Sequence, residues 1–218
     1  MKKEITLIIS TFLFLNVFCQ DNNSNTDFFN SNENINTNAV QKGNLIIEPW
    51  YGFPLWGKQI YTSVADTLDN FIYNGLGPFG GAVEFMLSDD VGLGVDFIYL
   101  SHAYSGFDQG IDAQGNPITY SYEFKMERIR VHLRMNYHFS QSENLDAYFG
   151  VGIGSNNRIF TSESNDPFWS NSSTTGALIP VSGRICVGTR YYFDSNFGFV
   201  IEAGLGGPLL RAGLSINI

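Results

Sequence analysis

Acidic and basic side chains recur at alternate positions of several apolar segments, and these side chains are the ones that could do chemistry. In residues 127–139, Arg128, Arg130 and Arg134 alternate with aliphatic side chains. Arginine suits enclosed sites, because its planar guanidinium forms paired hydrogen bonds with one carboxylate. The full candidate set is Glu48, Glu84, Asp96, Arg128, Arg130, Arg134, Asp146, Arg184, Arg190, Glu202 and Arg211. Such a set either offsets the cost of its own burial as a structural network or forms a gated path for a solute.

A second group has the residue types of acyl-transfer chemistry. His102 lies near Ser101, Ser105 and Asp108 in the sequence. A nucleophile needs a base and an orienting acid at defined positions, and this spacing fits no such motif. We therefore interpret His102 as a histidine at the edge of a loop and predict no catalytic residue.

The remaining histidines and the cysteines give no metal or redox motif. His132 and His138 share one strand face but lie too far apart along it to bind one metal ion by themselves. Cys186 is predicted to be a small buried residue. No phosphate loop, zinc motif or dinucleotide fingerprint occurs. We therefore predict no enzyme activity, no metal and no cofactor.

These charged side chains must be positioned by β-strands. From Arg128 to Phe139 polar and apolar residues alternate without interruption, which is the period of a strand and excludes a helix. Strand patterns cover residues 45–53, 79–87, 91–99, 119–139, 145–153, 179–193, 197–205 and 210–218. Long connections (57–75, 103–117 and 161–176) alternate with tight turns. Hairpin connections throughout predict an all-β fold, an eight-stranded antiparallel up-and-down barrel.

The fourth of these strands changes phase along its length. In residues 120–126 the apolar side chains occupy the positions that are polar in residues 128–138. A bulge near Glu127 and Arg128 would explain the change. An arm of the strand that projects beyond a bilayer would explain it equally well.

Alternation alone does not say whether lipid or water surrounds the barrel. A soluble lipocalin-like carrier would have the apolar face inside, and a membrane barrel would have it outside. Alternating short and long connections are typical of outer-membrane barrels. Glycines gather on the polar face, where a narrow lumen is crowded, at 80, 92, 94, 150, 152, 188, 198, 204 and 213. The same face carries six of the seven arginines, which favours a transmembrane β-barrel with a charged lumen.

Residues near the strand ends support the same prediction. Tyr137, Phe139, Tyr191 and Phe193 are placed where an interfacial aromatic girdle would lie. A water-facing surface would mix lysine with arginine, yet Lys125 is the last lysine of the chain.

The first residues predict export. Lys2 and Lys3 precede an apolar run, residues 5–19, which is typical of a signal peptide over residues 1–19. Cleavage after Cys19 and acylation of Cys19 as a lipoprotein are the two alternatives. Residues 20–43 are rich in Asn and predicted to be a disordered leader, and the barrel is predicted to span 44–218. The net charge of −9 argues against a nucleic-acid partner.

The C-terminal segment GGPLLRAGLSINI, the eight strands and the loop asymmetry together resemble the small OmpA/OmpX-type outer-membrane barrels, the "outer membrane protein beta-barrel domain" families. The resemblance covers residues 44–218. It implies a bacterial outer-membrane location, with outer-membrane lipid and the assembly machinery as partners. Such barrels commonly end in an aromatic residue that this machinery reads, whereas this chain ends in Ile218.

The function expected from this sequence is structural, adhesive or interaction-related, through the long external loops and an extracellular partner. Phe168, Trp169 and Tyr61 are candidate contact residues in those loops. The alternative is a narrow channel or small-solute transporter. A lipid-modifying enzyme and a soluble lipocalin-like carrier are the third and fourth hypotheses.

Overall fold

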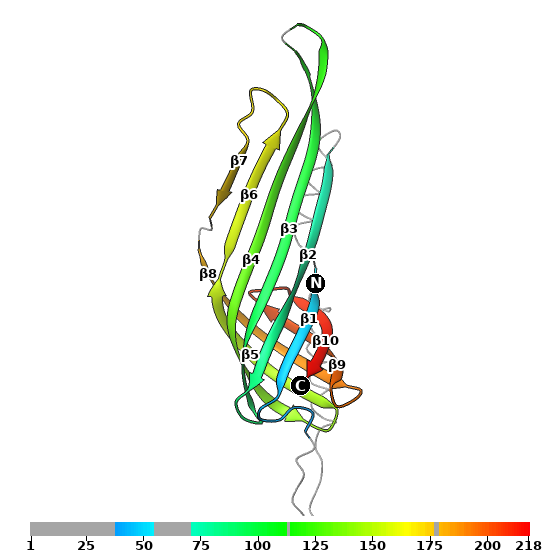
Figure 1. Cartoon of the computed structure of the whole chain (residues 1–218), viewed down its shortest axis with the longest axis vertical. Coiled ribbons are helices and arrows are strands. Elements are labelled where there is room, and N and C mark those ends of the chain that lie inside the picture. Colours follow the sequence, from blue (N-terminus) through cyan, green and yellow to red (C-terminus); the bar gives the residue numbers. More distant parts are fainter. Residues whose placement is uncertain (1–37, 55–70, 113, 177–178) are drawn as a thin grey trace, which may run out of the picture. The chain divides into compact units, whose positions relative to one another are not determined.

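The computed structural model describes residues 38–54, 71–112, 114–176 and 179–218, all of which belong to one compact unit. The described residues form ten strands (Figure 1). They are β1 (Leu45–Phe53), β2 (Ile72–Met86), β3 (Val91–Ile111), β4 (Pro117–Gln141), β5 (Leu145–Ser155), β6 (Asn157–Ser164), β7 (Ser172–Thr175), β8 (Val181–Tyr192), β9 (Phe197–Leu205) and β10 (Leu210–Asn217). No helix in the described part of the chain is long and apolar enough to cross a membrane.

Eight of the strands close into a ring. The hydrogen-bonded order is β1–β2–β3–β4–β5–β8–β9–β10, and β10 pairs back with β1. Every pairing is antiparallel, and the closing pair aligns Ile46 with Asn217 and Phe53 with Leu210. The predicted eight-stranded antiparallel barrel is confirmed, because each of these eight strands coincides with most of one predicted segment.

Strands β6 and β7 are additional and lie outside the ring. β5 pairs with residues 132–141 of β4 and ends before Asn156. β6 begins after Asn156 and pairs with residues 122–129 of the same strand. β7 pairs with β6. Together with residues 72–76 of β2, 100–111 of β3 and 117–128 of β4, they form a sheet extension that continues past the ends of β1 and β10 (Figure 1).

Two predicted loops are therefore wrong. Residues 103–117 form the end of the β3–β4 hairpin, whose pairing continues to Ile111 and Pro117. Residues 161–176 contain the β6–β7 hairpin. Glycine and polar residues weaken the strand pattern there, but the continuous backbone ladder holds the segments extended. Of the third predicted loop, 57–75, residues 72–75 belong to β2, and 55–70 lie outside the described residues.

The change of phase in β4 is not caused by a bulge. β3 and β4 pair without a register shift from Val91 and Tyr137 to Ile111 and Pro117. Along this unbroken ladder the outward side chains change from apolar to polar at Glu127. The projecting-arm alternative is therefore correct.

The ring is apolar outside and polar inside. Its outward side chains form an exposed apolar belt whose members include Tyr51, Val83, Phe85, Leu93, Val95, Phe97, Val131, Leu133, Met135, Phe149, Val151, Ile153, Ile185, Phe199, Ile201, Leu205 and Leu214. The four predicted girdle aromatics are each more than half exposed, and they lie at the end of the belt where the tight turns after β2, β4 and β8 are found. Tyr99 and Ile129 end the belt on the side of the sheet extension. A water-soluble barrel would bury such residues, so the soluble lipocalin-like hypothesis is wrong.

Residues 38–43, which belong to the segment predicted to be a disordered leader, pack against the end of the ring at which the tight turns lie. Val40 is fully buried in a cluster with Ile46, Met86 and Tyr192. The backbone NH of Ala39 donates to Ser142 O at 2.7 Å. The predicted signal peptide, the predicted Cys19 site and the rest of the leader lie outside the described residues.

Candidate functional site: the charged lumen and the barrel mouth

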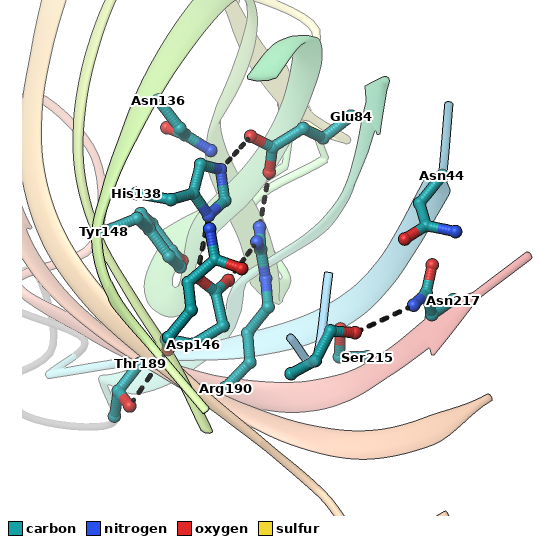
Figure 2. A network of polar contacts seen from close by, with 12 residues as sticks. Asn44, Glu84, Asn136, His138, Asp146, Tyr148, Thr189, Arg190, Ser215 and Asn217 are labelled. Carbon is teal, nitrogen blue, oxygen red and sulfur yellow. Dashed lines mark hydrogen bonds and ion pairs between the residues drawn. The ribbon is translucent and has the colours of Figure 1, made fainter. Parts of the chain in front are cut away.

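Arg190 from β8 is the centre of the first half of the lumen network. Its Nε donates to Glu48 Oε1 at 2.6 Å and its Nη1 to Asp146 Oδ2 at 2.8 Å, and its Nη2 pairs with Glu84. All four side chains are almost completely buried. Figure 2 shows Arg190 pointing toward Glu84 and Asp146, which come from β2 and β5. One guanidinium on β8 therefore binds carboxylates from three other strands, β1, β2 and β5.

Arg211 and Glu202 organise the second half. Arg211 contacts Asp96 Oδ1 at 3.0 Å and Glu202 Oε2 at 2.7 Å. Glu202 also forms an ion pair with Arg134 Nη1 at 3.1 Å, and it pairs with Arg184, whose Nε lies 3.3 Å from Asp96. Glu48 connects the two halves, because its second oxygen lies 3.4 Å from Arg211. Nine of the eleven predicted charged residues thus form one buried network.

His138 completes the charge balance of this network. Its Nδ1 lies 2.7 Å from Asp146 Oδ1 and its Nε2 lies 3.1 Å from Glu84 Oε1 (Figure 2). An imidazole that faces carboxylates with both nitrogens donates from both, which is the charged form. The network then holds five cationic and five anionic groups. Sequence reasoning treated His138 as a polar filler, because its two partners come from other strands.

Aromatic and glycine residues fill the space between the charges. The Arg190 guanidinium lies 4.3 Å from the centre of the Tyr148 ring, whose hydroxyl donates to Glu202 at 2.8 Å. The Tyr148 ring lies over Gly188, where a Cβ would be only 2.4 Å from the ring. Arg211 similarly lies 5.1 Å from the Trp50 ring. The lumen is thus packed with side chains, as the glycines on the polar face predicted.

Arg128 and Arg130 do not belong to the buried network, which corrects the predicted set. They lie half-buried at the mouth of the lumen, next to the sheet extension. Their Nε atoms lie 2.8 Å and 3.3 Å from the same atom, Asn156 Oδ1. Arg158 on β6 is directly opposite Arg128 in the register. Sequence reasoning missed Arg158 and Asn156, since both follow a strand that was predicted to end at 153.

A cavity of about 210 Å³ opens at this mouth. Its walls include Pro54, Ile98, Leu100, Met126 and Pro208, and the two arginines Arg128 and Arg130 form its charged side. The mouth therefore combines an apolar surface with positive charge that no carboxylate of the described residues neutralises.

The other candidate residues are not arranged for catalysis. His102 points to the inner face of β3, where its Nδ1 lies 2.5 Å from the Tyr73 hydroxyl, and burial lowers its pKa. Side chains alternate between the two faces of a strand, so the odd-numbered Ser101 and Ser105 lie on the opposite face of β3 from His102. His132 contacts Ser182 at 2.5 Å and Cys186 is buried. The described residues include no group of three or more acidic, histidine or cysteine side chains that could hold a metal ion.

A closed ring of eight strands, an apolar exterior and a charged, filled interior together define the architecture. It is that of a small OmpA/OmpX-type membrane barrel. Barrels of this kind reside in the bacterial outer membrane, with the apolar belt in contact with lipid.

Comparison with known proteins found solved structures of similar type at low sequence identity. The N-terminal β-barrel domain of Pseudomonas aeruginosa OprF is 16% identical, covers 82% of this chain and 100% of its own, and has a TM-score of 0.46. Pseudomonas aeruginosa OprG is 11% identical over 82% of this chain and 97% of its own, with a TM-score of 0.45. Ail of Yersinia pestis, in complex with the heparin analogue sucrose octasulfate, is 12% identical over 81% and 95%, with a TM-score of 0.36. No family model and no curated protein matches the chain.

Proposed function

We propose that this outer-membrane barrel serves an interaction or adhesive role through its sheet extension, and that its lumen charges are structural. The observation that carries the proposal is the unbroken β3–β4 ladder, which continues for about twelve residue pairs beyond Tyr99 and Ile129. At roughly 3.4 Å per residue this is longer than the interfacial region, so the tip stands clear of the membrane. A rigid surface held in the external medium is suited to contact with a partner.

The sheet extension offers two different surfaces to such a partner. Its outer face carries Glu123, Lys125 and Glu163 beside Thr161. Its inner face carries an aromatic cluster in which Trp169 lies 5.4 Å from Tyr122 and 5.8 Å from Phe124. Of the three predicted contact residues, Trp169 therefore packs locally, Phe168 is 94% exposed, and Tyr61 lies outside the described residues. Phe168 is the better contact candidate.

Surface labelling tests the orientation that this proposal requires. A Phe168→Cys variant should react with a membrane-impermeant maleimide in intact cells, because residue 168 is at the tip of the β6–β7 hairpin. The matched control is Ser195→Cys in the exposed β8–β9 turn at the other end, which should react only after lysis. The reverse pattern would contradict the proposal. Native Cys186 is buried and should contribute little background.

The channel hypothesis is the second candidate, and the charged lumen is the observation that favours it. Under the proposed structural role, Arg130→Ala leaves conductance across planar bilayers unchanged, since the Arg190 and Arg211 groups below it still fill the lumen. Under the channel hypothesis the same substitution removes a side chain from the mouth and raises the conductance. Single-channel recording of both proteins therefore separates the two functions. Fractionation with boiled and unboiled electrophoresis first checks that each protein is a folded, heat-modifiable membrane barrel.

Two partners follow from the outer-membrane location. The first is the assembly machinery, which inserts barrels of this class. The second is an extracellular molecule bound by the sheet extension.

A further inference from the structure

Three arginines at the mouth of the lumen have no carboxylate partner among the described residues. Arg128, Arg130 and Arg158 form none of the ion pairs found there, whereas each buried lumen arginine contacts at least one carboxylate. We call these three residues the mouth arginines. In a chain of net charge −9, a concentration of unneutralised positive charge requires an explanation.

The arrangement of the mouth arginines is unfavourable without an anion. Arg128 and Arg158 are directly opposite on neighbouring strands, and like charges in that position repel. Arg128 and Arg130 share a single neutral acceptor, Asn156 Oδ1. Most of their remaining N–H donors have no partner among the described residues, although each guanidinium carries five.

Asn156 is fixed, so it holds the two guanidiniums in place. It is 6% exposed, its backbone NH donates to Pro180 O at 2.7 Å, and its Nδ2 donates to Ile179 O at 3.0 Å. Arg130 is held a second time, because its Nη1 donates to Gly206 O at 2.5 Å. The donors are therefore positioned before any ligand arrives, which reduces the entropy cost of binding.

Buried donor atoms without partners point to the same place. Arg158 Nε is buried and has no hydrogen-bond acceptor in the described structure. The same holds for Nη1 of Arg184, a residue that is 2% exposed. That Nη1 lies against Gly207, where a Cβ would be 1.7 Å away, and Gly207 forms part of the wall of the mouth cavity. Unsatisfied buried donors are costly, and an oxyanion at the mouth would supply acceptors.

The cavity beside the mouth arginines determines the size and polarity of the group that the ligand carries next to its anion. Its volume is about 210 Å³ and most of its lining residues are apolar, among them Ile98, Leu100 and Met126. An apolar protein cavity of roughly 150 Å³ accepts benzene. The mouth can therefore take a compact apolar or ring-shaped group next to the cationic side.

We propose that the mouth arginines and the adjoining cavity bind a small soluble organic phosphate or sulfate ester from outside the cell. The tetrahedral oxyanion lies between Arg128, Arg130 and Arg158, and its compact organic group occupies the apolar cavity. Guanidinium suits this class, because its fork of donors matches phosphate and sulfate oxygens. The inference rests on the outward orientation proposed above, which the labelling experiment tests separately.

Calorimetric titration of the full chain in neutral detergent, with inorganic phosphate and phenyl phosphate as probes, tests the proposal. We expect one saturable site that binds phenyl phosphate more tightly than inorganic phosphate. Arg128→Gln and Arg158→Gln should each weaken both probes about tenfold or more, since each removes charge-assisted hydrogen bonds. Leu100→Phe, which narrows the cavity, should weaken phenyl phosphate only.

Lys125→Gln is the matched control, because it removes the same charge from the opposite face of the same strand. Its affinity for both probes should equal that of the unaltered chain. Unchanged affinity in both arginine variants, equal losses in Lys125→Gln, or absence of saturable binding by the unaltered chain would each overturn the proposal. Competition by phosphatidylglycerol vesicles would instead assign the site to a lipid headgroup and overturn the soluble ligand. Heat-modifiable mobility of each variant shows that loss of binding is not loss of folding.

Discussion

The two halves of β4 have opposite polarity although they belong to one continuous strand. In residues 129–139 the outward positions are apolar and the inward ones include Arg130, His132 and Arg134. In residues 117–127 the outward positions include Lys125 and Glu123, and the inward ones include the aromatic Phe124. The side-chain directions do not change at this point, since the register with β3 is continuous.

The difference shows that the surroundings of the strand, not its conformation, determine which face is apolar. In the ring, lipid covers the outside and the lumen must hold the polar side chains. In the sheet extension, water covers the outside and the aromatic cluster covers the inner face. The point of inversion at Glu127 therefore marks the level at which the outward face leaves the apolar part of the bilayer.

The largest expected effect comes from the lumen. Arg190→Met leaves Glu48, Glu84 and Asp146 buried without their shared cation, and we expect a loss of about 3–5 kcal/mol in the free energy of unfolding. Urea titration in detergent, followed by the mobility of unboiled samples, measures this loss. Arg128→Met at the mouth leaves no carboxylate of the described residues unpaired and should change stability far less. Equal losses of unfolding free energy in the two variants would show that the arginines of the mouth and of the lumen contribute to stability in the same way.

The outward faces of the two halves should respond differently to the same charge. Leu133→Arg places a guanidinium in the middle of the apolar belt and should cost about 2–4 kcal/mol in lipid. Glu123→Arg, ten residues earlier on the same face of β4, should be nearly neutral because water solvates it. Refolding titrations into phosphatidylcholine vesicles measure both. A large loss for Glu123→Arg would place the bilayer boundary above Glu127.

A smaller and local effect is expected in the sheet extension. Trp169→Ala removes ring contacts with Tyr122 and Phe124 and the hydrogen bond to Ser162 at 3.2 Å, a loss of about 1 kcal/mol per aromatic pair. The β6–β7 hairpin should exchange its amide hydrogens faster, while the ring strands keep their protection. Hydrogen exchange resolved by segment separates these two regions. Faster exchange throughout the ring would mean that the extension and the barrel unfold together.

The smallest effect concerns pH. A hydrogen bond from the Tyr99 hydroxyl at 2.5 Å, and then one from Lys125, hold the pKa of Glu127 below its ordinary value. A lowered pKa means that this group stabilises the fold above the ordinary carboxyl pKa and that the contribution is lost as pH falls through the lowered value. The protection of the amides near Glu127, taken relative to the intrinsic exchange rate at each pH, should thus fall at acidic pH, and Tyr99→Phe should reduce this dependence.

The sequence predicted the ring and most of the lumen because both depend on strict alternation. Every inward charge of the network, from Glu48 to Arg211, sits on a strand whose other face is apolar. The sequence could not predict which acid pairs with which arginine. Arg190 and Glu48, for example, are 142 residues apart, and only closure of the ring brings them together. The sheet extension was missed for a different reason. Its strands lie in water, so Tyr104 and Phe124 follow the opposite phase and the segment resembles a loop.

The pairing of β1 with β10 also constrains how the barrel assembles. Ile46 and Asn217 meet at opposite ends of the folded sequence, and Glu48 on β1 reaches its two arginines only when this seam is closed. In an open sheet Arg190 would keep Asp146 on β5 and Arg211 would keep Glu202 on β9, but Glu48 would face hydrocarbon without either arginine, which is prohibitively costly. Insertion into the bilayer and neutralisation of the lumen must therefore happen together. The last strand acts as the step that commits the chain to the membrane.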